Sequence, residues 1–240
     1  MLVEVCANSL QSAINAQEAG ADRIELCSEL AVGGITPSYG LLKAVREKIT
    51  IPVNVLIRPR SGDFSFSKDE FEIMKTNIAL CSELGFNGIV SGALHRDCSL
   101  DSDRTSELIA ASGDLSFTFH RAFDWVKNPY QVLEQLADLG VATILSSGQQ
   151  NSAVLGMELL SKLQSQNENI VIMPGSGINQ NNASEFKQKG FKALHLSAAR
   201  FYKTLETEPA VPMNSASFLY DNGVAVSNLE ILTAVVNAVK

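Results

Sequence analysis

The 240-residue sequence has no excess of positive charge, because 19 lysine and arginine residues stand against 26 aspartate and glutamate residues and leave a net charge of −7. Neither a nucleic-acid backbone nor an anionic membrane surface is therefore an expected partner. No apolar run approaches the roughly 20 residues that a membrane-spanning helix needs. The N-terminal stretch has no basic start and soon contains Glu4, so no signal peptide is expected.

Cysteine is also scarce: the sequence has four cysteines and no Cys-x-x-Cys pair. We expect them to be free thiols in a reducing cytoplasm. Cys81 falls inside a predicted helix and is interpreted as a packing residue. Cys98 ends the stretch His95–Cys98, which is interpreted as a surface loop, with a metal-binding turn as the less favoured alternative.

What the sequence does contain is a repeated unit, in which a helical pattern and a glycine precede a short apolar strand. The unit recurs as "AQEAGADRIELC", "CSELGFNGIVSG", "LADLGVATILSS" and "FKQKGFKALHLS". Its glycines suit the residue that follows a helix, where a left-handed backbone favours glycine: Gly20, Gly85, Gly140 and Gly190. The pattern predicts eight strands, at about 2–6, 23–27, 53–57, 88–92, 116–120, 143–147, 170–174 and 193–197. Helices are predicted between them, at about 9–19, 37–48, 67–84, 102–112, 129–139, 151–166 and 180–189.

Eight β–α units predict a TIM (β/α)8 barrel, with residues 1–200 forming the core of a single domain. Strands such as "PVNVLI" and "NIVIMP" are apolar throughout, as in a parallel sheet covered by helices. A doubly wound open sheet is the alternative. It is disfavoured because no Gly-x-Gly-x-x-Gly follows the first strand and because the repeat continues to eight.

Residues 201–240 differ from the repeat. Residues 201–226 have no clear periodicity and contain two prolines, and a last helix is expected from about Ser227, where "SNLE" resembles a capping box. Long irregular segments are uncommon in compact domains and tend to be functional. This segment is interpreted as an arm over the barrel or against a second subunit, or as an excursion before the last helix.

Two glutamate–cysteine pairs lie on the first two strands: Glu4 with Cys6, and Glu25 with Cys27. Residues two apart on a strand share a face, and an ionised glutamate beneath the helices would be costly, so both pairs are expected to point into the barrel. Soft thiolates select Cu(I) or zinc. The alternative is that these cysteines pack as small apolar residues.

Cationic and glycine-rich segments follow other strands. "LIRPRSGDF" and "FTFHRAFD" supply Arg58, His120, Arg121 and Asp124, and Asp124 is expected either to orient His120 or to pair with an arginine. "MPGSGI" indicates a phosphate-binding loop after the seventh strand, or a tight turn that needs glycine. Residues of these segments and of "HLSA" are predicted to hold an anion: Arg58, Arg121, Gly175, Ser176, Gly177 and Ser197.

Several segments together resemble the CutC family of copper homeostasis proteins: "EVCANSLQSAINAQEAGADRIELC", "GGITPSYGLL", "IRPRSGDF", "TFHRAFD", "SSG", "MPGSGI" and "HLSA". The resemblance covers about residues 2–200. It implies a cytoplasmic TIM barrel, a homodimer and a Cu(I) role in which Cys6 and Cys27 are the candidate ligands. It also implies glycine at the positions of Ser61, Cys98 and Ser176.

Two functional hypotheses follow. The resemblance favours a protein that buffers or delivers Cu(I) through Cys6 and Cys27. The residue chemistry favours an enzyme that acts on a small anionic metabolite, with or without a phosphate group. In the enzyme, His120 would be a general acid or base. The remaining predicted catalytic residues are Glu4, Glu25 and Asp124.

Overall fold

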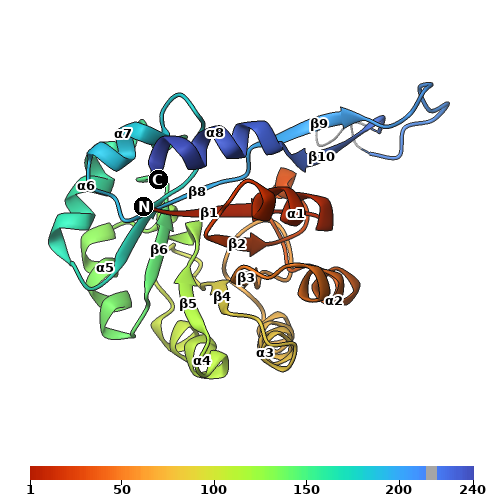
Figure 1. Ribbon diagram of the computed structural model, residues 1–240. Helices are drawn as coiled ribbons and strands as arrows, with labels where there is room; N and C mark the ends of the chain where they lie inside the picture. Colours follow the sequence, from red (N-terminus) through yellow and green to blue (C-terminus); the bar gives the residue numbers. More distant parts are fainter. Residues whose placement is uncertain (215–220) are drawn as a thin grey trace.

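A computed structural model describes residues 1–214 and 221–240 of the chain. Eight parallel strands form a nearly closed barrel with helices on its outside, as the sequence predicts (Figure 1). The strands are β1 (Leu2–Ala7), β2 (Arg23–Leu26), β3 (Val53–Leu56), β4 (Gly88–Ser91), β5 (Ser116–Phe119), β6 (Thr143–Ser146), β7 (Val171–Pro174) and β8 (Ala193–Leu196). They neighbour one another in the order β7-β6-β5-β4-β3-β2-β1-β8.

The first strand occupies a central place because it pairs with both β2 and β8. In this register Glu4 lies opposite Arg23 on one side and His195 on the other, and Cys6 lies opposite Glu25. Residues that are almost 200 positions apart in the sequence are thereby neighbours in the barrel wall.

The outer helices are α1 (Leu10–Glu18), α2 (Tyr39–Lys48), α3 (Lys68–Glu83), α4 (Ser102–Ser112), α5 (Pro129–Asp138), α6 (Met157–Gln166), α7 (Ala183–Gln188) and α8 (Leu229–Val239). Two short 3-10 helices, η1 (Leu30–Val32) and η2 (Arg121–Trp125), follow β2 and β5. The four glycines of the repeated unit have φ values of +79°, +74°, +80° and +82°, which confirms their predicted left-handed conformation. No helix in the described part of the chain is long and apolar enough to cross a membrane.

Three helices begin later than predicted: α2, α6 and α7. α2 is capped by Ser38, whose side chain accepts a hydrogen bond from the Leu41 N–H, whereas Thr36 is hydrogen-bonded to the backbone of Arg58. α6 begins at Met157 rather than near 151. The preceding segment makes a turn in which Gly156 lies against Ser147; a Cβ on Gly156 would come within 2.0 Å of the Ser147 carbonyl oxygen.

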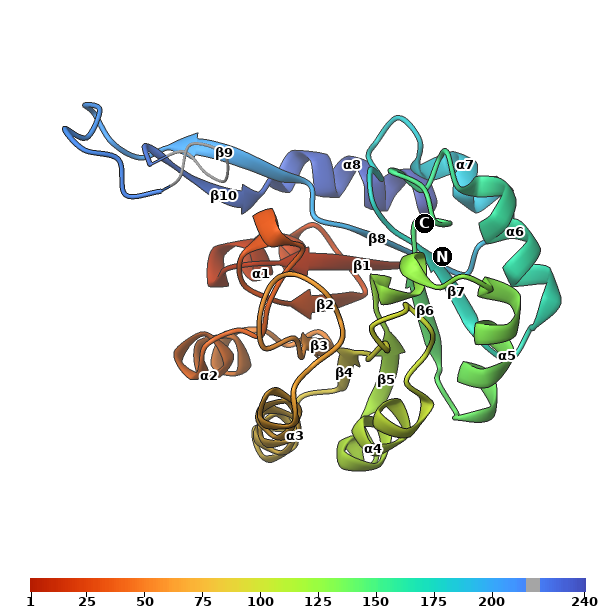
Figure 2. The ribbon, with the colours of Figure 1, turned by 180° about the vertical axis from the view of Figure 1, so that it is seen from behind.

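The C-terminal segment contains strands that its lack of periodicity did not predict. β9 (Ala199–Lys203) and β10 (Gly223–Ser227) pair antiparallel in a hairpin that projects away from the barrel (Figures 1 and 2). Residues 215–220 of the predicted arm lie outside the described residues. The hairpin returns to the barrel at Ser227, whose N–H donates to Ser12 of α1. The last helix is capped by Asn228 rather than Ser227, and it contacts both α1 and α7.

The main apolar core lies between the sheet and the helices, whereas the barrel interior combines two small apolar clusters with buried polar side chains. The buried polar side chains of the strands and their ends include Glu4, Glu25, Asn54, Arg58, Thr118, His120 and His195. TIM-barrel interiors are dominated by branched apolar residues, so this polar lining marks the interior as a candidate site.

Candidate functional site

A chain of charged side chains crosses the barrel interior from β2 through β1 to β8. Glu4 is fully buried, and its two oxygens lie 2.5 Å from Arg23 Nε and 2.9 Å from His195 Nδ1. Burial alone raises the pKa of Glu4, but the hydrogen bond from His195 and the charge of Arg23 outweigh it and hold that pKa below its ordinary value. Glu4 is therefore an ionised carboxylate between two cationic groups.

The two cysteines of the predicted pairs meet in the interior. Their Sγ atoms are 3.4 Å apart, and Cys6 Sγ lies 3.5 Å from Glu25 Oε1. Both thiols are buried and remain free cysteines. The contact with Cys27 and burial raise the pKa of Cys6 well above its ordinary value, so the thiol is protonated when no ion is bound.

His195 completes this cluster, although it is not among the site residues predicted from the sequence. Donor atoms of Cys6, Glu25 and His195 all lie within 4.8 Å of one another. Burial lowers the pKa of His195, but the charge of Glu25 and the hydrogen bonds with Cys6 and Glu4 raise it well above its ordinary value. Its position two residues before Ser197, on the same strand face, was the only signal in the sequence.

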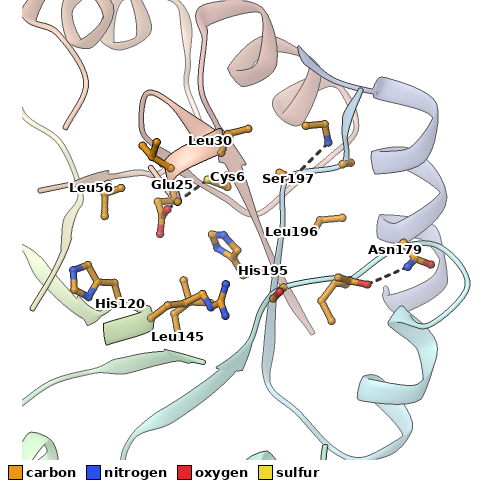
Figure 3. Close-up of a pocket in the computed structure, with 18 of the residues that line it drawn as sticks. Cys6, Glu25, Leu30, Leu56, His120, Leu145, Asn179, His195, Leu196 and Ser197 are labelled. Atoms are coloured by element: carbon orange, nitrogen blue, oxygen red, sulfur yellow. Dashed lines mark hydrogen bonds between the residues drawn. The ribbon is translucent and has the colours of Figure 1, made fainter. Parts of the chain in front are cut away.

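The cluster lies at one side of a pocket of about 530 Å³ at the carboxyl ends of the strands. Cys6, Glu25 and His195 are grouped together there, while His120 belongs to a separate part of the wall (Figure 3). Trp125, the single tryptophan of the chain, also lines the pocket.

Arg58 is buried at the pocket, and its two terminal nitrogens donate hydrogen bonds to carbonyl oxygens of neighbouring loops. Its Nη1 donates to the carbonyl oxygens of Val32 and Gly34, and its Nη2 donates to that of Gly62 at 2.6 Å. The Nε atom is buried and has no hydrogen-bond partner among the described residues. Burial and the neighbouring Arg60 charge lower the pKa of Arg58 from its ordinary value.

His120 is buried beside Arg58 and is uncharged. Its Nδ1 accepts a hydrogen bond from the Ala122 N–H at 3.4 Å, while its Nε2 is buried and has no partner in the part of the chain that the structure describes. Burial and the charge of Arg58 lower the pKa of His120 to about 3. An imidazole with this pKa is a weak base at neutral pH, so His120 is poorly suited to the general-base part of its predicted role.

Of the two roles predicted for Asp124, the structure shows pairing with an arginine. Arg121 Nε lies 2.8 Å from Asp124 Oδ2. The same carboxylate accepts hydrogen bonds from Ser146, Ser147 and Gln149. Asp124 therefore fixes the loop after β6.

The glycine-rich loop after β7 reaches the pocket through Ser176 and Gly177, and Ser197 lines the same pocket from β8. Ser176 has a φ of +80°, as Cys98 has one of +65°. Both lie in the left-handed region, which explains why glycine is implied at these positions. A Cβ on Gly175 would lie 2.6 Å from Leu145 Cδ1, so close packing alone requires that glycine.

The two remaining cysteines lie away from this cluster. Cys81 is fully buried in α3 and packs in the main apolar core, as predicted. Cys98 is partly buried in the loop before α4.

Comparison with known proteins identifies the family. The profile of the CutC family matches residues 1–200, which include all eight strands of the barrel. The chain belongs to the CutC family. CutC proteins from Photorhabdus laumondii and Edwardsiella ictaluri are 47% and 49% identical over 198 residues, which make up 82% of this chain and 80% and 79% of the relatives.

The solved structure of a CutC protein from Streptococcus agalactiae superposes on this chain with a TM-score of 0.78 at 33% sequence identity. The name of that protein links it to copper homeostasis. The match covers 82% of this chain and 98% of that one. The predicted family and fold are thus confirmed, and copper homeostasis is the role that the family name implies.

Proposed function

We propose that this CutC protein binds Cu(I) in the cytoplasm, as a buffer or a delivery protein, with the thiolates of Cys6 and Cys27 as its ligands. The observation that carries the proposal is the 3.4 Å separation of the two Sγ atoms. Two sulfurs bound to one ion at about 2.3 Å each can be at most about 4.6 Å apart. The two thiols therefore fit a shared ion, and Cu(I) prefers soft sulfur ligands.

The neighbouring side chains support the two sulfurs in different ways. The Glu25 oxygens are hard donors that suit Cu(I) poorly, so we assign Glu25 as the hydrogen-bond acceptor of the Cys6 thiol in the metal-free protein rather than as a ligand. His195 is a third donor within reach once it gives up its proton. Glu4 orients His195 through the bond to Nδ1, as carboxylates do for ligating histidines.

The test is an anaerobic titration against a chromophoric Cu(I) chelator. The wild type is expected to retain one Cu(I) per chain, and a Cys6→Ser/Cys27→Ser variant is expected to lose it. Cys98→Ser is the matched control, because Cys98 lies outside the pocket. Equal affinity in the double variant and the wild type would falsify the assignment.

A second candidate is an enzyme that acts on a small anionic metabolite. It is favoured by the pocket volume of about 530 Å³, which suits a small molecule rather than an ion. Under this proposal His120 is a hydrogen-bond donor to the substrate, because its low pKa disfavours a general base. Glu25, whose pKa is raised by burial, supplies the carboxyl group for proton transfer.

A thermal-shift screen with sugar phosphates and organic acids tests this candidate, with wild type and Arg121→Ala compared side by side. The Arg121 guanidinium lines the pocket and is half-exposed. An anion substrate is expected to raise the Tm of the wild type more than that of the variant. Equal shifts, or none, would remove the anion-binding role of Arg121.

A further inference from the structure

Two buried nitrogen atoms at the pocket have no hydrogen-bond partner within residues 1–214 and 221–240: Arg58 Nε and His120 Nε2. Both side chains are only 5% exposed, and both line the pocket. Buried polar groups are almost always hydrogen-bonded, and each one that is not costs about 1–3 kcal/mol. Two such atoms on one pocket wall indicate a ligand group that is complementary to them.

Both unpartnered atoms are hydrogen-bond donors. The Nε atom of an arginine always carries a hydrogen. His120 accepts the Ala122 N–H at Nδ1, so the single hydrogen of its uncharged ring lies on Nε2. The missing ligand group must therefore be an acceptor.

One aromatic ring packs against both side chains. The centroid of the Phe64 ring lies 4.7 Å from that of His120 and 5.0 Å from Arg58 Cζ. The three carbonyl oxygens bound by the other Arg58 nitrogens immobilise the guanidinium. The donors are thus preorganised, which lowers the entropic cost of binding.

We propose that this pocket binds a small carboxylic acid, whose carboxylate accepts hydrogen bonds from Arg58 Nε and His120 Nε2. The guanidinium charge selects an anion, and two donors suit the two oxygens of a carboxylate. Of the other cationic side chains that line the pocket, Arg121 is already paired with Asp124 and His195 with Glu4, and Arg200 lies on the exposed strand β9. The inference deepens the enzyme candidate by naming the substrate group; it rests on that candidate only for the location of the site and is independent of copper.

The single tryptophan makes binding measurable. Trp125 is 48% exposed, lines the pocket and lies 4.9 Å from the Phe64 ring. Its fluorescence in the metal-free protein is titrated with pyruvate, malonate, succinate and citrate, and separately with inorganic phosphate. We expect a saturable change with at least one carboxylate and none with phosphate. A response to phosphate alone, or to none of the compounds, would overturn the proposal.

Matched variants assign the binding to His120. His120→Phe keeps an aromatic ring but removes the donor, so affinity is expected to fall about 10-fold or more, as for a lost hydrogen bond to a charged group. His120→Gln keeps an N–H donor and is expected to stay within a few-fold of the wild type. His95→Phe, in the loop before α4 and outside the pocket, is the control. Unchanged affinity in a folded His120→Phe variant would overturn the assignment.

Two further measurements keep the test decisive if His120→Phe does not fold. Nitrogen NMR of labelled wild-type histidines should show His120 protonated at Nε2, with a signal that shifts on carboxylate addition; a signal that does not shift contradicts the proposal. The Cys6→Ser/Cys27→Ser variant should bind the carboxylate as the wild type does, whatever its Cu(I) affinity. Binding without turnover would remove the enzyme candidate and leave the carboxylate site standing.

Discussion

Glu4 is the residue on which the charged interior depends, because it contacts a cation on each side while having no solvent exposure. A buried carboxylate in water-free surroundings is stable only when it is paired and hydrogen-bonded. Arg23 from β2 and His195 from β8 supply both requirements. A single side chain of β1 thus joins three strands of the barrel.

Removal of the negative charge of Glu4 should destabilise the folded protein. We expect Glu4→Gln to lower the free energy of unfolding by about 3 kcal/mol, because it leaves the buried His195 and the partly buried Arg23 without their carboxylate partner. Urea denaturation followed by circular dichroism measures the change. Glu158→Gln is the control: Glu158 pairs with Lys162 on the surface of α6, where the loss should be below about 0.5 kcal/mol. Similar losses for the two variants would contradict the role given to Glu4.

The low pKa of His120 makes stability dependent on pH. The unfolded chain takes up a proton at this residue near its ordinary pKa of about 6.5, whereas the folded protein does so only at about 3. Between these values the unfolded state binds more protons, so stability falls as the pH falls. This residue should remove about 2 kcal/mol between pH 7 and pH 5.

Urea denaturation of wild type and His120→Gln at both pH values isolates that contribution, since the other titrating groups are common to both proteins. The variant should lose about 2 kcal/mol less than the wild type over this interval. Parallel losses would show that His120 titrates normally in the folded protein.

Part of the site was predictable from residue spacing. Alternation along a strand places Glu4 beside Cys6 and Glu25 beside Cys27 on one face, and the structure brings these four residues into the interior. The partnership of Glu4 with His195 was not predictable, because it depends on the register between β1 and β8. The uncharged state of His120 was equally out of reach, since it follows from burial and from the position of Arg58.

At the scale of elements, the loop between β2 and α2 packs against Cys27. Gly34 has a φ of +86°, and a Cβ there would lie 2.7 Å from Leu56 Cδ2 and 3.5 Å from Cys27 Cβ. Its carbonyl oxygen also accepts a hydrogen bond from Arg58. The loop therefore contacts both the guanidinium of Arg58 and Cys27, which follows β2.

A side chain at Gly34 should disturb the positions of both Arg58 and Cys27. We expect Gly34→Ala to destabilise the protein by about 2 kcal/mol through backbone strain and overpacking, and to weaken Cu(I) retention in the chelator assay. Gly40→Ala in α2 is the matched control, because nothing lies within 4 Å of the added Cβ and alanine favours helices. A loss in Gly40→Ala as large as that in Gly34→Ala would point to a general sensitivity of this region.

The elements themselves were predictable where the sequence carries local signals. The Ser-x-x-Glu spacing of Ser67 and Glu70 is a local signal for a capping box, which the structure contains, and the glycines of the repeated unit follow the ends of their helices. The hairpin was missed because each of its strands is only five residues long and its partner lies about 20 residues away. Pairing of this kind is settled by tertiary contacts rather than by local pattern.

At the scale of the whole molecule, the projecting hairpin supports the prediction of a homodimer. Tyr202 and Val224 face each other in its register and are 43% and 50% exposed. We expect light scattering to give twice the chain mass of 25.9 kDa. A Tyr202→Asp/Val224→Asp variant should be monomeric, because charges in an apolar interface are strongly unfavourable.

Leu155→Asp serves as the control, since Leu155 is 68% exposed in the segment before α6 and not in the hairpin. It should leave the mass unchanged. A monomeric wild type would contradict the dimer itself, and a dimeric hairpin variant would place the interface elsewhere.

The pairing of β1 with β8 has a consequence for how the protein is made. The ribosome synthesises β1 first. The edge of β1 that pairs with β8 can form its hydrogen bonds only after residues 193–196 have been synthesised. Until then the nascent chain carries an unpaired strand edge and a carboxylate without its imidazole, and such intermediates are prone to aggregate. Translation that stops before β8 would therefore yield no partly working protein, but a substrate for chaperones and proteases.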